Sequence, residues 1–407
     1  QMCIRDSGVI STQYIMTTLE ELGLLKMDFL GLRTLTVIRN ACELVKQNRG
    51  IDVVFDKEMN DPKVYKLWQD GDSIGIFQFE SQGMTNFMKE LKPDCLEDII
   101  AGVSLYRPGP MDQIPRYIAN KKDPEHAVYT DDSLKPILKV TYGCMVYQEQ
   151  VMQIVRDLAG YSLGRADLVR RAMGKKKLDV MAKERENFVH GKLDENGNVE
   201  IPGCIRNGID EKSANQIFDE MAEFAKYAFN KSHAACYAVV SYRTAYLKAY
   251  YPAEFMAAML NSFLGNLDKI PIYINECRRL KIDILKPDVN KSFEDFTVEN
   301  NKIRFGLGSV KSVGTTAVEN IVKERNENGP FKDFTDFCER TFDKQVNKKS
   351  IECLIKAGAF DEFNKTRSTL LASYIKIMDL VSDEHSKDFS NQITMFDIAN
   401  NEDEVKN

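Results

Sequence analysis

The sequence lacks the marks of several protein classes. Its nine cysteines form no C-x-x-C pair, which argues against a disulfide framework and indicates reduced thiols in a cytoplasmic protein. The four histidines stand at no metal-ligand spacing from those cysteines, so no zinc site is expected. No apolar run approaches the roughly 18 residues of a membrane span, and no basic-then-apolar start indicates a secretory signal.

The sequence also lacks an excess of positive charge. Its formal net charge is -6 and its pI is about 5.6, which alone disfavours a surface covered with nucleic acid. Local patches rather than net charge decide such binding, however. Hydrophobic residues make up 43% and charged residues 29% of 407 residues. This balance allows large cores, and the length suits about two to four domains.

Helical periodicity is the dominant hydrophobic pattern in the sequence. From Thr34 to Val45, apolar side chains share one face of a predicted helix: Leu35, Ile38, Ala41 and Leu44, with Cys42 and Val45. The stretch from about residue 50 to 280 is mainly helical by the same test, as at Val151, Ile154, Val155 and Leu158. A helix over 237–247 is expected to end near Pro252. We therefore predict a mainly α fold with small β elements (α+β).

Short β elements are predicted at three places. Residues 24–30 indicate a strand that runs into a turn. Residues 194–198 have the composition of an exposed hairpin turn, and residues 296–305 that of a small hairpin.

Beyond this hairpin the sequence predicts short helices. Thr316 and Glu319 fit a capping box at the start of one, with Val318 facing inward. Ser350 starts another, which stops at Gly358. A last helix is expected over 370–381, followed by a polar and acidic tail.

Asp28 is an acid within the apolar segment KMDFL (26–30), where an unpaired carboxylate is costly to bury. One interpretation is a salt bridge with Lys26 or Arg33. The other is a Mg²⁺ ligand at the end of a strand. Composition alone favours the salt bridge.

Residues 165–177 concentrate Arg and Lys. A helix would place Leu168 and Ala172 on one face and Arg170, Arg171 and Lys175 on another. Clustered cations repel one another unless an anion neutralises them, and guanidinium groups suit phosphate oxygens. The run therefore predicts phosphate binding, and a solvated basic face is the alternative.

The segment FNKSHA (229–234) precedes a predicted helix that Ser232 can cap. Lys231 and His233 lie near the positive end of that helix, and such an end with cations around it binds anions well. The alternative is an ordinary capped helix start.

Glycines at positions 306, 308 and 314 are too frequent for a helix interior. They suit a tight turn between two short helices, where backbone amides face a phosphate and Lys311 adds charge. Residues 356–360, around Gly358, are expected to form the matching turn of a second unit. Two such turns predict a helix-hairpin-helix pair, which holds duplex DNA by its backbone. A structural helical hairpin is the alternative.

The segment QITMF (392–396) is apolar within a polar tail. Exposed apolar residues in a flexible segment favour binding to a pocket of a partner. The alternative is a tail that folds back on its own domain.

Together these segments resemble one family, the α subunit of bacterial DNA polymerase III, a C-family replicative DNA polymerase. The resemblance runs from about Thr12 to Phe396. Its carriers are KMDFLGLRTL (26–35), GIFQFES (75–81), YRPGPM (106–111), YQEQVM (147–152), the basic run 165–177 and FNKSH (229–233). Their order and spacing are specific.

The resemblance implies a partial palm, a large helical fingers domain and a tandem helix-hairpin-helix domain. The implied boundaries are 1–45 for a palm remnant, 46–284 for the fingers, 285–366 for the DNA- and clamp-binding domain, and 367–407 for a helix and flexible tail. The intact protein would be a DNA-directed DNA polymerase, a nucleotidyltransferase that adds deoxynucleotides to a primer 3′ end.

The resemblance also implies site residues. Asp28 would be one of three palm carboxylates that hold two Mg²⁺ ions, which turns the interpretation of this residue toward a metal ligand. The implied nucleotide contacts are Lys26, Arg170, Arg171, Lys175, Lys231 and His233. The implied duplex contacts are Gly306, Gly308, Lys311, Gly314 and Gly358, and the implied clamp contacts are Gln392, Met395 and Phe396. The expected partners are primer–template DNA, deoxynucleoside triphosphates, the sliding clamp (β subunit) and other replicase subunits, with no membrane.

The chain departs from the family pattern upstream of Asp28. No Asp-x-Asp pair precedes it, and the earliest acid is Asp6. The thumb, an amino-terminal phosphoesterase-like domain and a C-terminal oligonucleotide-binding fold are absent too, and Tyr227-Ala228 stand where Gly-Tyr-Gly is expected. We therefore expect a fragment that is inactive alone, because one carboxylate cannot organise two metals. The alternatives are an inactive DNA- and clamp-binding scaffold and a lesion-bypass relative.

Overall fold

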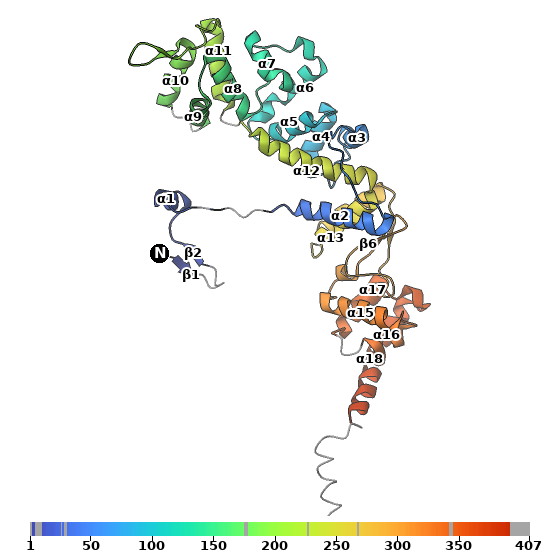
Figure 1. Cartoon of the computed structure of the whole chain (residues 1–407). Coiled ribbons are helices and arrows are strands. Elements are labelled where there is room, and N and C mark those ends of the chain that lie inside the picture. Colours follow the sequence, from blue (N-terminus) through green and yellow to red (C-terminus); the bar gives the residue numbers. More distant parts are fainter. Residues whose placement is uncertain are drawn as a thin grey trace, which may run out of the picture.

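The computed structural model describes residues 2–4, 10–25, 27, 31–174, 178–225, 228–266, 268–341 and 345–390. Helices dominate and the strands are short, which confirms the predicted mainly α fold with small β elements. In Figure 1 the helices follow one another along a curved, elongated body, from α9–α11 at one end to α18 at the other. None of the described helices is long and apolar enough to cross a membrane.

Two helices that are distant in sequence form the middle of this body. Helix α2 (Arg33–Arg49) lies against α13 (Pro252–Ser262), and Val37, Ile38 and Ala41 share a core with Phe255 and Leu260. Helix α14 (Ile270–Arg279) packs on the same core. Helix α2 thus continues past the boundary expected at residue 45 and packs on helices assigned to the fingers.

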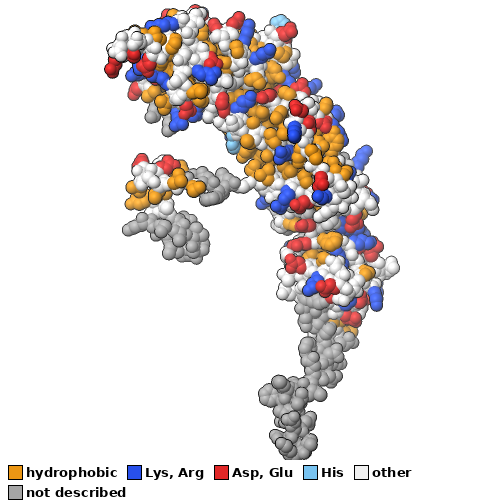
Figure 2. Space-filling model, viewed as in Figure 1, with side chains coloured by type: hydrophobic (Ala, Val, Ile, Leu, Met, Phe, Trp, Pro, Cys, Tyr) orange, Lys and Arg blue, Asp and Glu red, His pale blue; other side chains and the backbone are white. Residues whose placement is uncertain are grey.

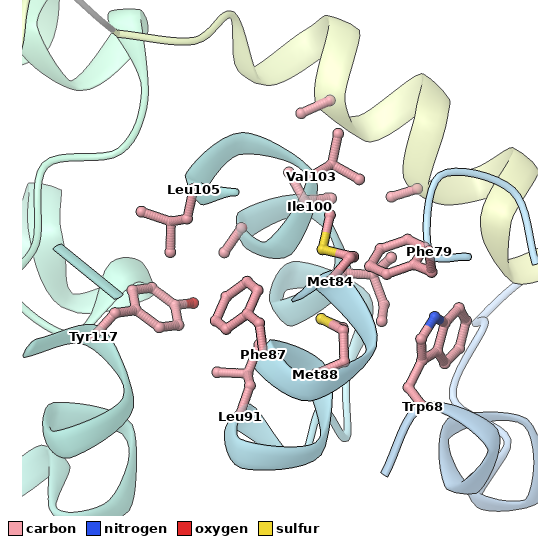
Figure 3. Close-up of a cluster of buried hydrophobic side chains, with 14 of the residues drawn as sticks. Trp68, Phe79, Met84, Phe87, Met88, Leu91, Ile100, Val103, Leu105 and Tyr117 are labelled. Carbon is pink, nitrogen blue, oxygen red and sulfur yellow. The ribbon is translucent and has the colours of Figure 1, made fainter. Parts of the chain in front are cut away.

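Helix α12 (Lys231–Tyr250) borders a second core. It packs on α5 (Leu96–Leu105) and on α3 (Pro62–Asp70), with α4 (Gln82–Leu91) beneath them. Figure 3 shows Trp68, Phe79, Phe87 and Met88 gathered in this core. The helix ends at Tyr250, before Pro252, as predicted.

A third core unites helices that precede α12 in the chain. They are α8 (Gln148–Ala159), α9 (Leu163–Gly174), α10 (Leu178–His190) and α11 (Glu211–Phe224), joined by α7 (Lys135–Leu138). Helix α6 (Ile114–Lys122) instead contributes Tyr117 and Ile118 to the second core. Val151, Ile154, Val155 and Leu158 are all buried, which confirms the predicted face of α8. Strands β3 (Lys192–Leu193) and β4 (Val199–Ile201) enclose the predicted turn at 194–198.

The C-terminal part of the chain has a small sheet, which packs on the core of α2 and α13, and four helices, which share a core of their own. Strands β6 (Thr297–Glu299) and β7 (Lys302–Arg304) form the predicted hairpin, and β5 (Ile284–Leu285) adds a parallel strand that the sequence did not signal. The helices are α15 (Thr315–Asn328), α16 (Phe334–Arg340), α17 (Lys348–Ala357) and α18 (Arg367–Ser390). Val318 is buried in their shared core, as predicted, and Ile351 and Leu354 are buried beside it.

Short elements complete the chain. Strand β1 (Met2–Ile4) pairs antiparallel with β2 (Ile10–Thr12), and α1 (Met16–Glu21) follows without a buried residue. Short 3-10 turns lie at Pro110–Gln113, Pro124–His126, Asp132–Leu134, Lys139–Thr141, Leu307–Ser309 and Asp361–Phe363.

Two predictions of local conformation near the amino terminus are wrong. Leu24, Leu25 and Met27 lie outside any strand, and Leu25 is 86% exposed. The strand expected over 24–30 therefore does not form at these residues. Leu35, predicted on the inner face of α2, is 50% exposed because it stands in the first turn of that helix, before the residues that contact α13.

Two helix starts also differ from the prediction. Helix α15 begins at Thr315, and its N-cap is Gly314, which has no side chain to accept a hydrogen bond. The capping box expected from Thr316 and Glu319 therefore does not form. Helix α17 begins at Lys348, where the side chain of Asn347 accepts a hydrogen bond from the Ser350 amide at 2.9 Å.

Candidate functional site

The start of α8 and the start of α12 are joined side by side. Tyr147 and Phe229 form a parallel β-bridge, and the amide of Gln148 donates to the carbonyl of Phe229 at 2.9 Å. The side chain of Asn230 caps α12 by accepting from the amide of His233 at 2.8 Å. The prediction that Ser232 is the cap is wrong, because the helix begins at Lys231 and its cap, Asn230, lies two residues earlier.

Arg170 and Arg171 on α9 share one carboxylate. Asp167 accepts from Arg170 Nε at 3.0 Å and from Nη2 at 2.8 Å, and its other oxygen lies 2.8 Å from Arg171 Nη2. The hydrogen bond from Arg170 lowers the pKa of Asp167 below its ordinary value. Arg171 is 62% exposed and Arg170 only 23%, so the two arginines occupy different surroundings.

The predicted inner face of α9 is partly wrong. Ala172 is buried, but Leu168 is 64% exposed. The buried positions are instead Ala166, Val169, Ala172 and Met173. This turns Arg170 toward α8, where its Nη1 donates to Gln148 Oε1 at 3.1 Å.

Lys231 and His233 lie at the same junction. Lys231 Nζ forms an ion pair with Glu97 at 3.1 Å and lies 5.2 Å from the ring centroid of Tyr147. His233 is exposed, and its ring stands against those of Phe229 (5.4 Å) and Tyr237 (4.4 Å). The structure thus brings two pairs of basic residues together from distant parts of the chain: Arg170 and Arg171 on α9, and Lys231 and His233 on α12.

The sequence interpretation missed a fifth basic side chain at this junction. The Arg107 guanidinium lies 3.9 Å from the centroid of the Phe229 ring, and its side chain is exposed. Such a cation–π contact fixes the direction of the guanidinium. Arg107 precedes the stiff Pro108-Gly109-Pro110 loop. An arginine held beside so rigid a loop is the sequence feature that could have indicated a binding residue here.

Positive charge is local rather than spread over the molecule. Figure 2 shows basic and acidic side chains interspersed over most of the visible face, with hydrophobic side chains gathered over α12. At the junction, Glu97 and Asp167 are already paired with cations, and Glu149 accepts from the backbone amide of Lys231. The outward-facing groups are Arg107, Arg171 and His233, a set that suits an anionic ligand.

Lys26, Asp28 and Lys175 lie outside the described residues, so their predicted roles stay predictions. The same holds for Gln392, Met395 and Phe396 in the tail and for Tyr227.

The glycine-rich turn serves a different purpose from the one predicted for Gly306 and Gly308. The Gly308 amide donates to the carbonyl of Glu294 at 3.0 Å, so it does not face a phosphate. A Cβ on Gly306 would lie 2.3 Å from the same carbonyl oxygen. Both glycines therefore permit a close backbone crossing with residues 294–295.

Gly314 lies at the open start of α15, and Lys311 lies shortly before it. Their contact with DNA stays a prediction. Gly314 precedes α15, nothing lies within 4 Å of its Cβ position, and Lys311 is exposed. A surface pocket of about 400 Å³ opens here, and it is lined from both helix starts by Ser312, Val313, Gly314, Thr316, Ala317, Gln345, Asn347 and Ser350. The first turns of α15 and α17 thus border one concavity.

Gly358 does not border this pocket. It lies at the opposite, C-terminal end of α17, with a left-handed φ of 87°. A Cβ there would lie 2.1 Å from Arg367 Nη2, which is itself bound to Asp361 at 2.6 Å. Its amide donates to the carbonyl of Ile355 at 3.0 Å. The contact of Gly358 with DNA stays a prediction.

Comparison with known proteins finds two family models that match successive parts of the chain. The finger domain of the bacterial DNA polymerase III alpha subunit matches residues 34–196, and a helix-hairpin-helix motif matches residues 281–370. A DNA polymerase III subunit alpha from Thermus aquaticus is 47% identical over 391 residues, which is 95% of this chain. The chain belongs to the bacterial DNA polymerase III α-subunit family.

Other DNA polymerase III α subunits are similar to the same extent. The protein from Borreliella burgdorferi is 43% identical over 98% of this chain, and the one from Bacillus subtilis is 46% identical over 90%. The chain spans about a third of the length of these relatives: 31% for Thermus aquaticus, 34% for Borreliella burgdorferi and 32% for Bacillus subtilis.

One acidic group elsewhere in this family member has the composition of a metal site. The ligand atoms of Asp94, Cys95 and Asp98 lie within 4.8 Å of one another. The ammonium group of Lys121 forms ion pairs with Asp98 and, at 3.2 Å, with Asp94. Asp98 and Lys121 therefore form a buried ion pair, and Asp94 adds an exposed carboxylate to the same ammonium group.

Proposed function

We propose that this chain supplies the nucleotide-facing and duplex-facing surfaces of a DNA-directed DNA polymerase. In the intact protein, deoxynucleotides would be transferred to a primer 3′ end under the direction of a template. The observation that carries this proposal is the convergence of Arg107, Arg171, Lys231 and His233 at the α8–α12 junction, within a chain of the DNA polymerase III α-subunit family.

A nucleoside triphosphate suits this junction electrostatically. Arg171 has free guanidinium nitrogens and is 62% exposed, so it can bind phosphate oxygens in a fork. Lys231 and His233 stand in the first turn of α12, where the helix dipole adds favourable charge for an anion. Arg107 approaches from another loop. We propose that these groups neutralise and orient the triphosphate.

Duplex DNA is the proposed ligand of the helix-hairpin-helix region. The α15 start at Gly314, the exposed Lys311 and the pocket shared with α17 offer backbone amides and charge to phosphate oxygens. Contacts of this kind hold a duplex without reading its sequence.

Mg²⁺ is proposed for the intact active site, with Asp28 as one ligand. The carboxylates described around the junction do not fit that role, because Glu97, Glu149 and Asp167 are each already engaged. Mg²⁺, when bound, would supply Lewis-acid stabilisation of developing charge. This chain's described residues would bind and orient the triphosphate.

The sliding clamp and other replicase subunits are further proposed partners. The segment QITMF (392–396) is the proposed clamp contact. Substitution of Met395 and Phe396 by Ala in the full-length protein should abolish stimulation by the clamp and spare distributive synthesis.

The test of the proposed function is binding of this chain to a labelled primer–template duplex over a series of salt concentrations, with and without clamp. We expect affinity that falls steeply with salt, because phosphate contacts release counterions, and that rises with clamp. Absence of binding at low salt would overturn the duplex role. For the nucleotide role, Arg171→Ala in the full-length protein should raise the nucleotide KM, and an unchanged KM would contradict it.

A further inference from the structure

We infer that Gln148 is a positioning residue that holds the arginines of α9 in register with the start of α12. The inference rests on the proposed nucleotide site and adds a residue that does not itself touch the ligand. Gln148 is the first residue of α8, and it lies between Arg170 on one side and residues 228–229 on the other.

The side chain of Gln148 spans the two elements with opposite hydrogen-bonding roles. Its Oε1 accepts from Arg170 Nη1 at 3.1 Å, and its Nε2 donates to the carbonyl of Ala228 at 2.8 Å. Its backbone amide adds a bond to Phe229 at 2.9 Å. A primary amide suits this position, because its acceptor and its donors lie on two separate atoms at one side-chain end.

Arg170 is thereby held from two directions. Asp167 accepts from its Nε and Nη2, and Gln148 accepts from its Nη1, so each nitrogen of the guanidinium has a partner within α9 or α8. The neighbouring Arg171 has a single ion pair and projects into solvent. In this arrangement Arg170 braces the junction, and its position fixes the direction in which α9 presents Arg171.

Glu149 strengthens the same connection. Its carboxylate accepts from the amide of Lys231 at 3.0 and 3.1 Å and from Asn230 Nδ2 at 2.9 Å. The Gln148–Glu149 pair therefore fixes both the residues before α12 and its first turn. Loss of the Gln148 side chain removes the part of this connection that reaches α9.

The experiment compares Gln148→Ala and Gln148→Glu in the full-length protein by steady-state primer extension. Gln148→Ala should raise the nucleotide KM about tenfold, the change expected when one hydrogen bond to a charged group is lost, while kcat changes less. Gln148→Glu keeps an acceptor for Arg170 but sets a carboxylate against the Ala228 carbonyl, so its KM should rise as well. Wild-type KM values in both variants, or in Gln148→Glu alone, would overturn the inference.

Matched controls separate positioning from loss of fold. Gln216→Ala on α11 removes an exposed glutamine that bonds only Glu220, and its KM should equal that of the wild type. Duplex affinity should be unchanged in Gln148→Ala, and its urea midpoint should fall only slightly, because two side-chain hydrogen bonds are lost. If duplex affinity falls in that variant while the nucleotide KM rises, the role of Gln148 is structural and the inference fails.

A double-mutant cycle gives an independent measure. If Gln148 acts through Arg170, the effects of Gln148→Ala and Arg170→Ala on kcat/KM should be less than additive. Additive effects would contradict coupling of the two residues. Arg171→Ala distinguishes the two proposals: an unchanged KM in that variant defeats the nucleotide site itself, whereas a raised KM with wild-type behaviour of Gln148→Ala defeats only the inference.

Discussion

Lys248 Nζ lies 2.7 Å from Glu276 Oε1, and both side chains are almost completely buried. The same ammonium donates to the carbonyls of Asp72 at 2.8 Å and Ile74 at 2.7 Å. Burial lowers the pKa of Lys248, and the Glu276 carboxylate opposes this effect. One ammonium group thus connects α12, α14 and the loop after α3.

Substitution of Lys248 by Met should destabilise the protein strongly. It leaves the Glu276 carboxylate with Arg279 as its remaining cation and removes the donor of two carbonyls. Removal of one partner of a buried ion pair costs about 3–5 kcal/mol. Urea unfolding followed by circular dichroism measures this loss. The control Lys66→Met breaks an exposed pair with Asp70 and should cost at most about 1 kcal/mol; equal losses in both variants would refute the prediction.

The glycines of the 306–314 turn should differ in their tolerance of Ala. At Gly306 a Cβ would lie 2.3 Å from a backbone oxygen, so Gly306→Ala must displace the crossing with residue 294 and should cost roughly 1–3 kcal/mol. At Gly314 the space is open and φ is -79°, so Gly314→Ala should leave the melting temperature unchanged. Calorimetry of the two variants checks this; a lower melting temperature in Gly314→Ala but not in Gly306→Ala would be the contrary result.

The ion pairs of Asp361 should make stability depend on acid pH. Hydrogen bonds from Arg367 (2.6 Å) and Lys286 (2.8 Å) hold the pKa of Asp361 well below its ordinary value. Because the folded pKa is depressed, the stabilisation is fully present above an ordinary Asp pKa of about 4 and is lost as pH falls below it.

Asp361→Asn removes this carboxylate and should lower the free energy of unfolding by about 1 kcal/mol at pH 7, since the group is only partly exposed and its partners are charged. Urea unfolding of both proteins between pH 7 and pH 3 measures the difference, which should shrink below pH 4. A difference that stays constant or grows toward pH 3 would contradict the assignment.

The cysteines should differ in their reaction with iodoacetamide at pH 8. Burial raises the pKa of Cys144 to about 11 and those of Cys204, Cys277 and Cys338 to about 12, so these thiols stay protonated and covered. Cys236 is exposed on α12. Mass spectrometry of the native protein should find label on Cys236 well before those four, which should react only after unfolding. Early labelling of Cys277 would show that its core opens.

Short-range pattern accounted for most of the helices. The apolar spacing at 151–158 placed α8, and Pro252 marked the end of α12 correctly. The same pattern misplaced Leu35 and Leu168, because periodicity shows that a helix has an apolar face but not which turns a neighbouring helix covers. Two helix starts were misplaced by two residues, because Asn230 and Gly314, and not the expected Ser232 and Thr316, precede the first turn.

The sequence by itself determined the helical class, the family resemblance and four of the five basic residues of the candidate site, because local propensity, charge and motif order are properties of neighbouring residues. Only the tertiary structure decided that Arg107 and Gln148 belong to that site, since each meets its partner through a contact between segments far apart in the chain. It also decided that Gly306 permits a close backbone crossing with residues 294–295, whereas the space around Gly314 is open. Such roles depend on what lies across space from a residue, and a linear pattern carries no information about that distance.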